Sequence, residues 1–289
     1  SFDSKKEFSD VIQRIVGRSG REVNVANPIV DTRLPGGERV NVVLYPISVS
    51  GSVMTVRKFP KKRITIDTLK ENGTLTEEVA VFLKSMVEEK RNIFISGGTS
   101  SGKTTFLNIL SDFIPKNERI ITIEDSAELQ INGIQNLVRM EVRNANTTGN
   151  GEVSIKELIK TSLRMRPDRI IVGEVRGEEA LDMLNAMNTG HDGSISTGHA
   201  NSSYDMLYRL ESMVLQSGVS FPLLAIRQHI CSAIDLIVHL SRMSDGKRKV
   251  VEISEIERIK NGEILLNTLY EMKNGVLVGT GNKMTRRKK

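Results

Sequence analysis

Residues 97–105 read Gly97-Gly98-Thr99-Ser100-Ser101-Gly102-Lys103-Thr104-Thr105, which matches the pattern G-x-x-x-x-G-K-[ST]. The stretch follows a short apolar run at 93–95 and precedes a run at 106–110 whose apolar residues recur at helical spacing. A strand, a glycine-rich turn and a helix in this order are the context in which the pattern binds phosphate. The stretch therefore predicts an α/β fold built around a phosphate-binding loop.

The loop has the chemistry of a nucleotide site. Its glycines let successive backbone N–H groups converge on one anion, and the helix that follows adds the positive end of its dipole. Lys103 can reach the β- and γ-phosphates of ATP, and the Thr104 hydroxyl can bind Mg²⁺. The alternative, a serine- and glycine-rich turn that carries a lysine by chance, is disfavoured by the flanking strand and helix. We expect all nine residues to bind ATP.

The composition is that of a soluble globular protein with a sizeable core. Of 289 residues, 38% are hydrophobic and 26% are charged. The single cysteine, Cys231, argues against a disulfide framework and favours a reducing compartment. A net charge of +6 permits nucleic acid or an acidic membrane surface as a partner but requires neither. No apolar run in the sequence is as long as a membrane span.

The chain divides into two predicted domains. Residues 1–60 predict a small α+β domain, residues 61–73 a basic and polar linker, and residues 74–289 the nucleotide domain. In the first domain, apolar spacing predicts a helix over 8–16, and strand-like runs lie at 23–26, 40–45 and 53–59. Three arginines lie on or beside these strands: Arg33, Arg39 and Arg57. Each of them alone would be interpreted as a surface charge.

Acidic residues follow the first apolar strand after the phosphate loop. Residues 119–125 form a predicted strand that ends in Glu124 and Asp125, with Glu128 close behind. An isolated acid here could simply cap a helix, as Asp125 could. Because α/β folds bind ligands at the carboxyl ends of their strands, a role beside the phosphate loop is the better interpretation.

A second acid follows the buried strand at 169–172. There Gly173 takes the position where a Walker B strand usually has its aspartate, so Glu174 is the only acid available. An acid at this point faces Mg²⁺ and the attacking water, since catalysis of phosphoryl transfer depends mostly on positioning and charge compensation. We therefore expect Glu174 to be both a catalytic and a metal-binding residue.

Two histidines lie eight residues apart, each beside a glycine: His191 and His199. A lone histidine is more often structural than a ligand. No cysteine or histidine at ligand spacing accompanies the pair, which argues against a zinc site. The functional alternative is a strand end that senses the γ-phosphate.

Four blocks agree in order and spacing with one family. They are the Walker A loop at 97–105, the aspartate box at 121–129, the Walker B block at 163–177 and the histidine box at 186–201. The N-terminal stretches 33–41 and 56–59 match as well. The sequence resembles the secretion and pilus motor ATPases, which include type II and type IV secretion ATPases and type IV pilus motors. Within that superfamily it is most similar to the tight-adherence (Flp) pilus ATPases of the CpaF type.

The resemblance implies a PAS-like N-terminal domain linked to a RecA-like domain with a mostly parallel sheet. It also implies a ring hexamer that binds ATP and Mg²⁺ between the two domains. Three arginines are then expected to approach the phosphates from the N-terminal domain: Arg33, Arg39 and Arg57. Glu128, or the nearby Glu124, is expected to act as the base. Glu174 would polarise water or hold Mg²⁺, and His199 would contact the γ-phosphate.

The chain departs from the family pattern in two places. Residues 143–149 lack the proline and the acid expected there, which suggests altered subunit contacts. Gly198 stands where the family usually has an apolar residue, which suggests a looser strand before His199.

These features predict an ATP-hydrolysing motor for a pilus or a secretion machine, acting through a membrane platform protein at the cytoplasmic face of the inner membrane. No specific nucleic acid is expected, and the direction of movement is left open. One alternative is a RecA-like nucleic-acid translocase, which the basic charge favours and the 4% aromatic content disfavours. The other is a non-catalytic scaffold gated by nucleotide, which the acids beside the loop disfavour.

Overall fold

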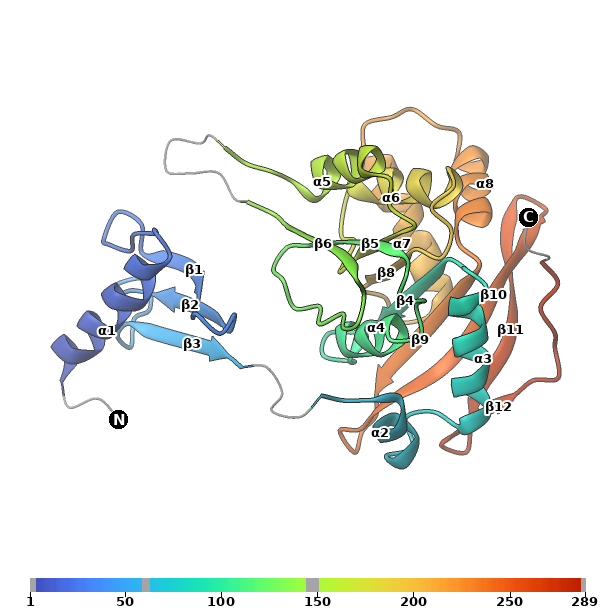
Figure 1. Cartoon of the computed structure of the whole chain (residues 1–289), viewed down its shortest axis with the longest axis horizontal. Coiled ribbons are helices and arrows are strands. Elements are labelled where there is room, and N and C mark those ends of the chain that lie inside the picture. Colours follow the sequence, from blue (N-terminus) through green and yellow to red (C-terminus); the bar gives the residue numbers. More distant parts are fainter. Residues whose placement is uncertain (1–3, 59–62, 144–150, 287–289) are drawn as a thin grey trace. The chain divides into compact units, whose positions relative to one another are not determined.

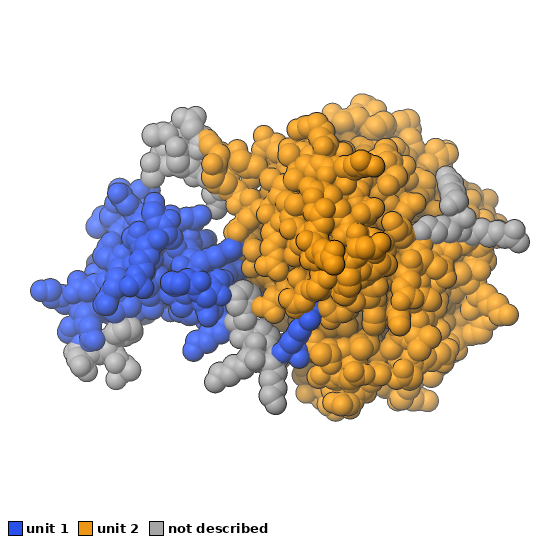
Figure 2. Space-filling view, viewed as in Figure 1, with its two compact units in different colours: residues 1–63 blue, residues 64–289 orange. Residues whose placement is uncertain are grey.

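The computed structural model describes residues 4–58, 63–143 and 151–286. The chain forms two compact units, residues 1–63 and residues 64–289, which are coloured separately in Figure 2. Residues 61 and 62 of the expected linker lie outside the described residues, as do residues 144–149 of the loop expected to alter subunit contacts.

The first unit is a three-stranded antiparallel sheet in the order β1-β2-β3 with one helix packed on it. Its elements are α1 (Lys5–Arg18), β1 (Ile29–Arg33), β2 (Arg39–Val43) and β3 (Val53–Arg57) (Figure 1). The Ser4 hydroxyl accepts a hydrogen bond from the N–H of Glu7 at 3.1 Å, which caps the start of α1. Ile12 and Val16 of α1 are buried in one cluster with Val42 of β2.

The strand expected at 23–26 is wrong. The side-chain oxygen of Asn24 accepts hydrogen bonds from the N–H groups of Ala26 and Asn27, both at 2.9 Å, and this holds the stretch in a turn. The first strand of the sheet is β1 instead, five residues of which two are buried.

The stretch expected as a linker is partly helical. α2 (Ile66–Glu71) begins at Thr65, whose side chain and that of Thr68 each accept a bond from the other's backbone N–H. Leu69 of α2 is buried in a core cluster of the second unit. Residues 66–71 therefore belong to the second unit rather than to a linker.

A nine-stranded sheet lies at the centre of the second unit, in the order β12-β11-β10-β9-β4-β8-β7-β5-β6. The strands from β9 to β6 in this order pair in parallel, and those from β9 to β12 pair antiparallel. The predicted α/β class with a mostly parallel sheet is confirmed. The bounds are β4 (Ile93–Gly97), β5 (Arg119–Glu124), β6 (Asn136–Glu141), β7 (Arg169–Val172), β8 (Ile195–Gly198), β9 (Leu236–Arg242), β10 (Arg248–Lys260), β11 (Glu263–Lys273) and β12 (Val276–Gly279).

Helices cover both faces of this sheet (Figure 1). They are α3 (Glu77–Glu88), α4 (Lys103–Ser111), α5 (Ile155–Ser162), α6 (Glu179–Asn188), α7 (Ser203–Gln216) and α8 (Leu223–Ala233), with a short 3-10 turn at Leu163–Met165. Ile95 of β4 packs in one core cluster with α3 and α4, whereas its neighbour Phe94 packs in a second cluster with α5, α6, α7 and α8. Successive strand residues point to opposite faces, so the two clusters lie on opposite sides of the sheet.

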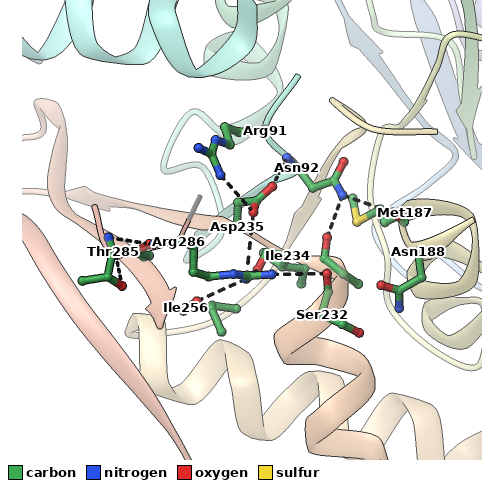
Figure 3. A network of polar contacts seen from close by, with 12 residues as sticks. Arg91, Asn92, Met187, Asn188, Ser232, Ile234, Asp235, Ile256, Thr285 and Arg286 are labelled. Carbon is green, nitrogen blue, oxygen red and sulfur yellow. Dashed lines mark hydrogen bonds and ion pairs between the residues drawn. The ribbon is translucent and has the colours of Figure 1, made fainter. Parts of the chain in front are cut away.

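A polar network ties the amino-terminal ends of β4 and β9 to the end of the described chain (Figure 3). The carboxylate of Asp235 accepts from the N–H of Asn92 at 2.9 Å and lies 3.7 Å from Nη1 of Arg91 and 3.9 Å from Nη1 of Arg286. Arg286 also donates to the carbonyl oxygen of Ile234 at 2.8 Å, close to the C-terminus of α8. This network lies at the edge of the sheet opposite to the phosphate loop.

In the described part of the chain, no helix combines the length and the apolar composition that a membrane span needs.

Candidate nucleotide site

The phosphate loop connects β4 to α4, as predicted. Gly97 and Gly102 have φ angles of +156° and +97°, which side chains rarely adopt. A side chain at Gly97 would also collide with the carbonyl oxygen of Leu240 in β9. The tight turn therefore depends on two glycines of the pattern.

The other residues of the loop differ in burial. Ser101 is buried, whereas Thr99 and Ser100 are exposed, and Thr104 and Thr105 lie half-buried in the first turn of α4.

Lys103 folds back over this loop. Its Nζ donates hydrogen bonds to the carbonyl oxygens of Gly97 and Gly98, at 3.0 and 3.1 Å, and lies 3.2 Å from Nδ1 of His199. Burial lowers the pKa of Lys103, and the nearby carboxylate of Glu174 partly opposes that effect. The lysine thus lies where a phosphate group on the loop would meet it.

His199 connects Lys103 to the Walker B acid. Its Nε2 lies 2.7 Å from Oε1 of Glu174. Burial lowers the pKa of His199, and the positive charge of Lys103 lowers it further. Because the ammonium group of Lys103 can only donate, Nδ1 is the acceptor, and the contact network assigns the ring proton of the neutral imidazole to Nε2. Lys103, His199 and Glu174, all predicted site residues, therefore form one continuous row.

Arg176 extends this row to the aspartate box. Its Nε donates to Oε2 of Glu174 at 2.7 Å, and its Nη1 lies 3.0 Å from Oδ2 of Asp125. Sequence reasoning did not select Arg176, although it stands only two residues after Glu174. An arginine beside the predicted acid could have been found from that spacing.

Glu124 and Glu128, the two candidates for the base, differ in their surroundings. Glu124 is 4% exposed, and its Oε1 accepts the N–H groups of Glu128 and Leu129 at 2.8 and 2.9 Å. Burial raises the pKa of Glu124 to about 7, although these two hydrogen bonds oppose the rise. Glu128 is half-buried. Glu124 therefore holds the backbone of the turn that carries Glu128.

The two histidines lie at opposite ends of β8. His199 follows the strand and faces the phosphate loop, whereas His191 precedes it and has its Nδ1 3.3 Å from the carbonyl oxygen of Ala186. Beside His191, the fully buried Arg169 donates to the carbonyl oxygens of Val87 at 2.7 Å and Gly193 at 3.4 Å. Of the two histidines, only His199 therefore lies beside the phosphate loop, whereas the stretch around His191 is held by contacts to the backbone and to the buried Arg169.

Gly198 is tightly packed. A Cβ at this position would lie 2.9 Å from Phe94 and 3.1 Å from Met206. Gly198 also pairs in register with Ser96 of β4. The expectation that this glycine loosens the strand before His199 is not supported by these contacts.

A buried histidine that sequence reasoning missed lies directly under the loop. His239 of β9 is in register with Ser96 of β4, and its Nδ1 lies 2.7 Å from the Ser96 hydroxyl. Burial lowers the pKa of His239. Nothing in the local sequence around His239 distinguishes it, because the contact depends on the pairing of two strands far apart in the chain.

The three predicted arginines of the first unit stand opposite one another. Arg39 is the register partner of Arg33 in β1 and of Arg57 in β3. Directly paired residues point to the same face of a sheet, and this is the face opposite to the buried Val40 and Val42. The arginines therefore form one row across the sheet of the first unit.

Among the residues that the structure describes, no three or more histidine, cysteine or acidic side chains gather as a set of metal ligands.

Comparison with known proteins places the chain in a family. The family model described as type II/IV secretion system protein matches residues 1–273. The putative conjugal transfer protein Rv3659c of Mycobacterium tuberculosis is 32% identical over 281 residues, which cover 95% of this chain and 79% of that protein. The type IV secretion system protein PtlH of Bordetella pertussis is 35% identical over 258 residues, which cover 81% and 76%.

Solved structures agree with these relatives. The VirB11 ATPase of the Brucella suis type IV secretion system aligns with a TM-score of 0.56 and 28% identity, over 87% of this chain and 83% of that one. With its phosphate loop, acidic strand ends and histidine box in the family's order, the chain belongs to the type II/IV secretion system protein family.

Proposed function

We propose that this chain is an ATP-hydrolysing motor of a secretion or pilus machine. One observation carries the proposal: Lys103, His199 and Glu174 form a continuous row of contacts at the carboxyl edge of the sheet. In this row the ammonium group of Lys103 and the carboxylate of Glu174 lie beside the same glycine-rich loop. A turn that only happened to contain a lysine would not need an acid and a histidine arranged in this way.

ATP would lie with its phosphates on residues 97–105, at the N-terminus of α4. The Thr104 hydroxyl and the Glu174 carboxylate are oxygen donors, the ligand type that Mg²⁺ prefers, and these two residues would hold the ion together with the phosphates. Bound Mg²⁺ supplies charge neutralisation at the β- and γ-phosphates.

The acids would act on the attacking water. Glu174 would orient it, and Glu128 is the better candidate for the base because one oxygen of Glu124 already accepts two backbone N–H groups. Lys103 and His199 would stabilise the charge that develops on the transferred phosphoryl group. The neutral tautomer of His199 that carries its proton on Nε2 can donate a hydrogen bond there.

The arginine row supports a role in binding phosphate. Arg33, Arg39 and Arg57 are in register across three strands and lie on one face of the sheet, so their guanidinium groups can converge on one anion. We propose that these arginines, in a PAS-like domain spanning residues 1–60, approach the phosphates when it closes on a RecA-like domain.

The motor would work as a homohexameric ring at the cytoplasmic face of the inner membrane, where closure and opening of its subunits would move a membrane-embedded platform protein. The family to which the chain belongs supports this arrangement.

The test is steady-state ATP turnover by the full chain, with native mass measured in parallel. We expect cooperative turnover by a six-subunit species, and a decrease of about a hundredfold or more in Lys103→Ala and Glu174→Gln. Lys84→Ala removes a lysine that is half-exposed on α3 and should leave turnover unchanged. Undiminished turnover in Lys103→Ala would contradict the proposal, and stimulation by single-stranded DNA would favour a translocase.

A further inference from the structure

A second positively charged side chain, besides Lys103, contacts the phosphate loop on the side away from Glu174. Arg248 is the first residue of β10, and its Nε donates to the carbonyl oxygen of Ser100 at 2.9 Å. A Cβ on Gly102 would lie 3.2 Å from Cδ of Arg248, so the aliphatic part of the arginine covers the residue that precedes Lys103. Arg248 therefore contacts the loop at two points.

The sheet order fixes which flank this is. β4, which leads into the loop, lies between β8 and β9. His199 and Glu174 follow β8 and β7 on one side, whereas Arg248 comes from β10, beyond β9, on the other. His199 and Glu174 thus lie on one flank of the loop and Arg248 on the other, all at the same edge of the sheet.

For ATP bound to the loop as proposed above, this placement assigns the two ends of the nucleotide to the two flanks. The γ-phosphate belongs beside Lys103, His199 and Glu174, because bond cleavage needs the acid there. The phosphate chain then crosses the N-terminus of α4, and the ribose and base must leave the loop on the other flank. Arg248 is the side chain that the structure places on that flank in contact with the loop.

The head of Arg248 suits such a ligand. The residue is exposed, and within residues 4–58, 63–143 and 151–286 its two terminal nitrogens have no hydrogen-bond or ion-pair partner. A guanidinium group is planar and weakly hydrated, and it stacks on aromatic rings more readily than an ammonium group does.

We propose that Arg248 binds the nucleoside half of the nucleotide, with its guanidinium plane against the base. This rests on the proposed binding of ATP to the loop. The alternative is that Arg248 only braces the backbone at Ser100, in which case it would affect every ligand that contains phosphate to the same degree.

The experiment compares the binding of a non-hydrolysable ATP analogue, ADP and inorganic tripolyphosphate, each with Mg²⁺, by titration calorimetry on the full chain. We expect Arg248→Ala to weaken the binding of the ATP analogue and of ADP about tenfold. The affinity for tripolyphosphate should stay within about twofold of that of the unmodified chain. Arg248→Lys should retain only part of the affinity, because an ammonium group stacks less well. In turnover, KM should rise while kcat changes little.

Arg242→Ala is the matched control. Arg242 is the register partner of Arg248, it is also exposed, and in the described part of the chain its side chain makes no hydrogen bond or ion pair with the loop. Its substitution removes the same charge and should leave all three affinities unchanged. Equal weakening of tripolyphosphate and the nucleotides in Arg248→Ala would overturn the proposal in favour of a brace, and unchanged affinities would overturn it outright. Failure of the unmodified chain to bind any of the three ligands would instead overturn the proposed function.

Discussion

Glu124 occupies the space that a side chain at position 173 would need: a Cβ on Gly173 would lie 3.0 Å from Cγ of Glu124. This explains why the Walker B strand ends in glycine where an aspartate is usual. The carboxylate from β5 fills the volume next to β7, and the acid of the Walker B block moves one residue on, to Glu174. The two strands are direct neighbours in the sheet, so one side chain excludes the other.

Restoring the usual aspartate at position 173 should therefore lower both the stability and the ATP turnover of the protein. We expect Gly173→Asp to lower the free energy of unfolding by about 1–3 kcal/mol, because overpacking forces neighbouring groups apart and brings a second acid against Glu124. ATP turnover should fall as well. Urea denaturation and a turnover assay check both. Combining Gly173→Asp with Glu124→Ala should recover part of the stability, since the two positions are in contact. Simple additivity of the two effects would contradict a shared space.

The raised pKa of Glu124 predicts a pH-dependent stability. The folded protein holds this proton up to about pH 7, whereas the ordinary value is 4.5. The free energy of unfolding should therefore fall as the pH rises from about 4.5 to about 7, by at most about 3 kcal/mol, because the unfolded chain loses the proton first. Glu124→Gln should lack this decrease, which urea denaturation at several pH values measures.

Glu157→Gln is a control of opposite sign. The hydrogen bond from the N–H of Ser154 lowers the pKa of the Glu157 carboxyl group, so its contribution to stability is present at neutral pH and lost as the solution becomes acidic. If the free energy of unfolding of Glu124→Gln still fell as the pH rose from about 4.5 to about 7, a group other than Glu124 would be the cause.

The first half of the histidine box should affect stability rather than chemistry. Gly193 has a φ of +82°, and a Cβ there would lie 2.5 Å from Nη1 of Arg169 and 3.0 Å from the backbone of Lys90. Gly193→Ala should lower the free energy of unfolding by about 2–4 kcal/mol, from backbone strain and a clash with a buried guanidinium group. Gly190→Ala imposes similar strain, with a φ of +94°, but has nothing within 4 Å of the added Cβ. Equal losses in the two variants would contradict the role of Arg169.

How much the sequence predicts follows from the range of each interaction. The phosphate loop and the acids Glu124 and Glu174 were predictable, because glycine spacing is local and the carboxyl ends of parallel strands meet at one edge. The contacts of His239 and Arg248 were not, because each depends on which strand pairs with β4 and β9. The alignment of three arginines likewise depends on hairpin register, which no local pattern specified.

Arg286 should stabilise the second unit from the edge of the sheet away from the loop. Its Nη1 donates to the carbonyl oxygens of Ile234 and Ile256 at 2.8 and 3.2 Å, and the fully buried carboxylate of Glu255 accepts its backbone N–H at 2.7 Å. Arg286→Ala would leave these carbonyl groups without that donor and should lower the free energy of unfolding by about 1–3 kcal/mol, measured by urea denaturation. The kcat for ATP should stay unchanged, because the network does not reach the phosphate loop.

Lys283→Ala is the control for this region. It removes a positive charge three residues earlier, at an exposed position whose backbone carbonyl, not its side chain, accepts a hydrogen bond from Asn267. Its stability should match that of the unmodified chain, because the backbone contact remains. If Lys283→Ala were as destabilised as Arg286→Ala, the effect would come from the charge of the segment and not from the hydrogen bonds of Arg286. If only Arg286→Ala lowered the free energy of unfolding, the effect would come from its hydrogen bonds to the carbonyl groups at the end of α8 and in β10.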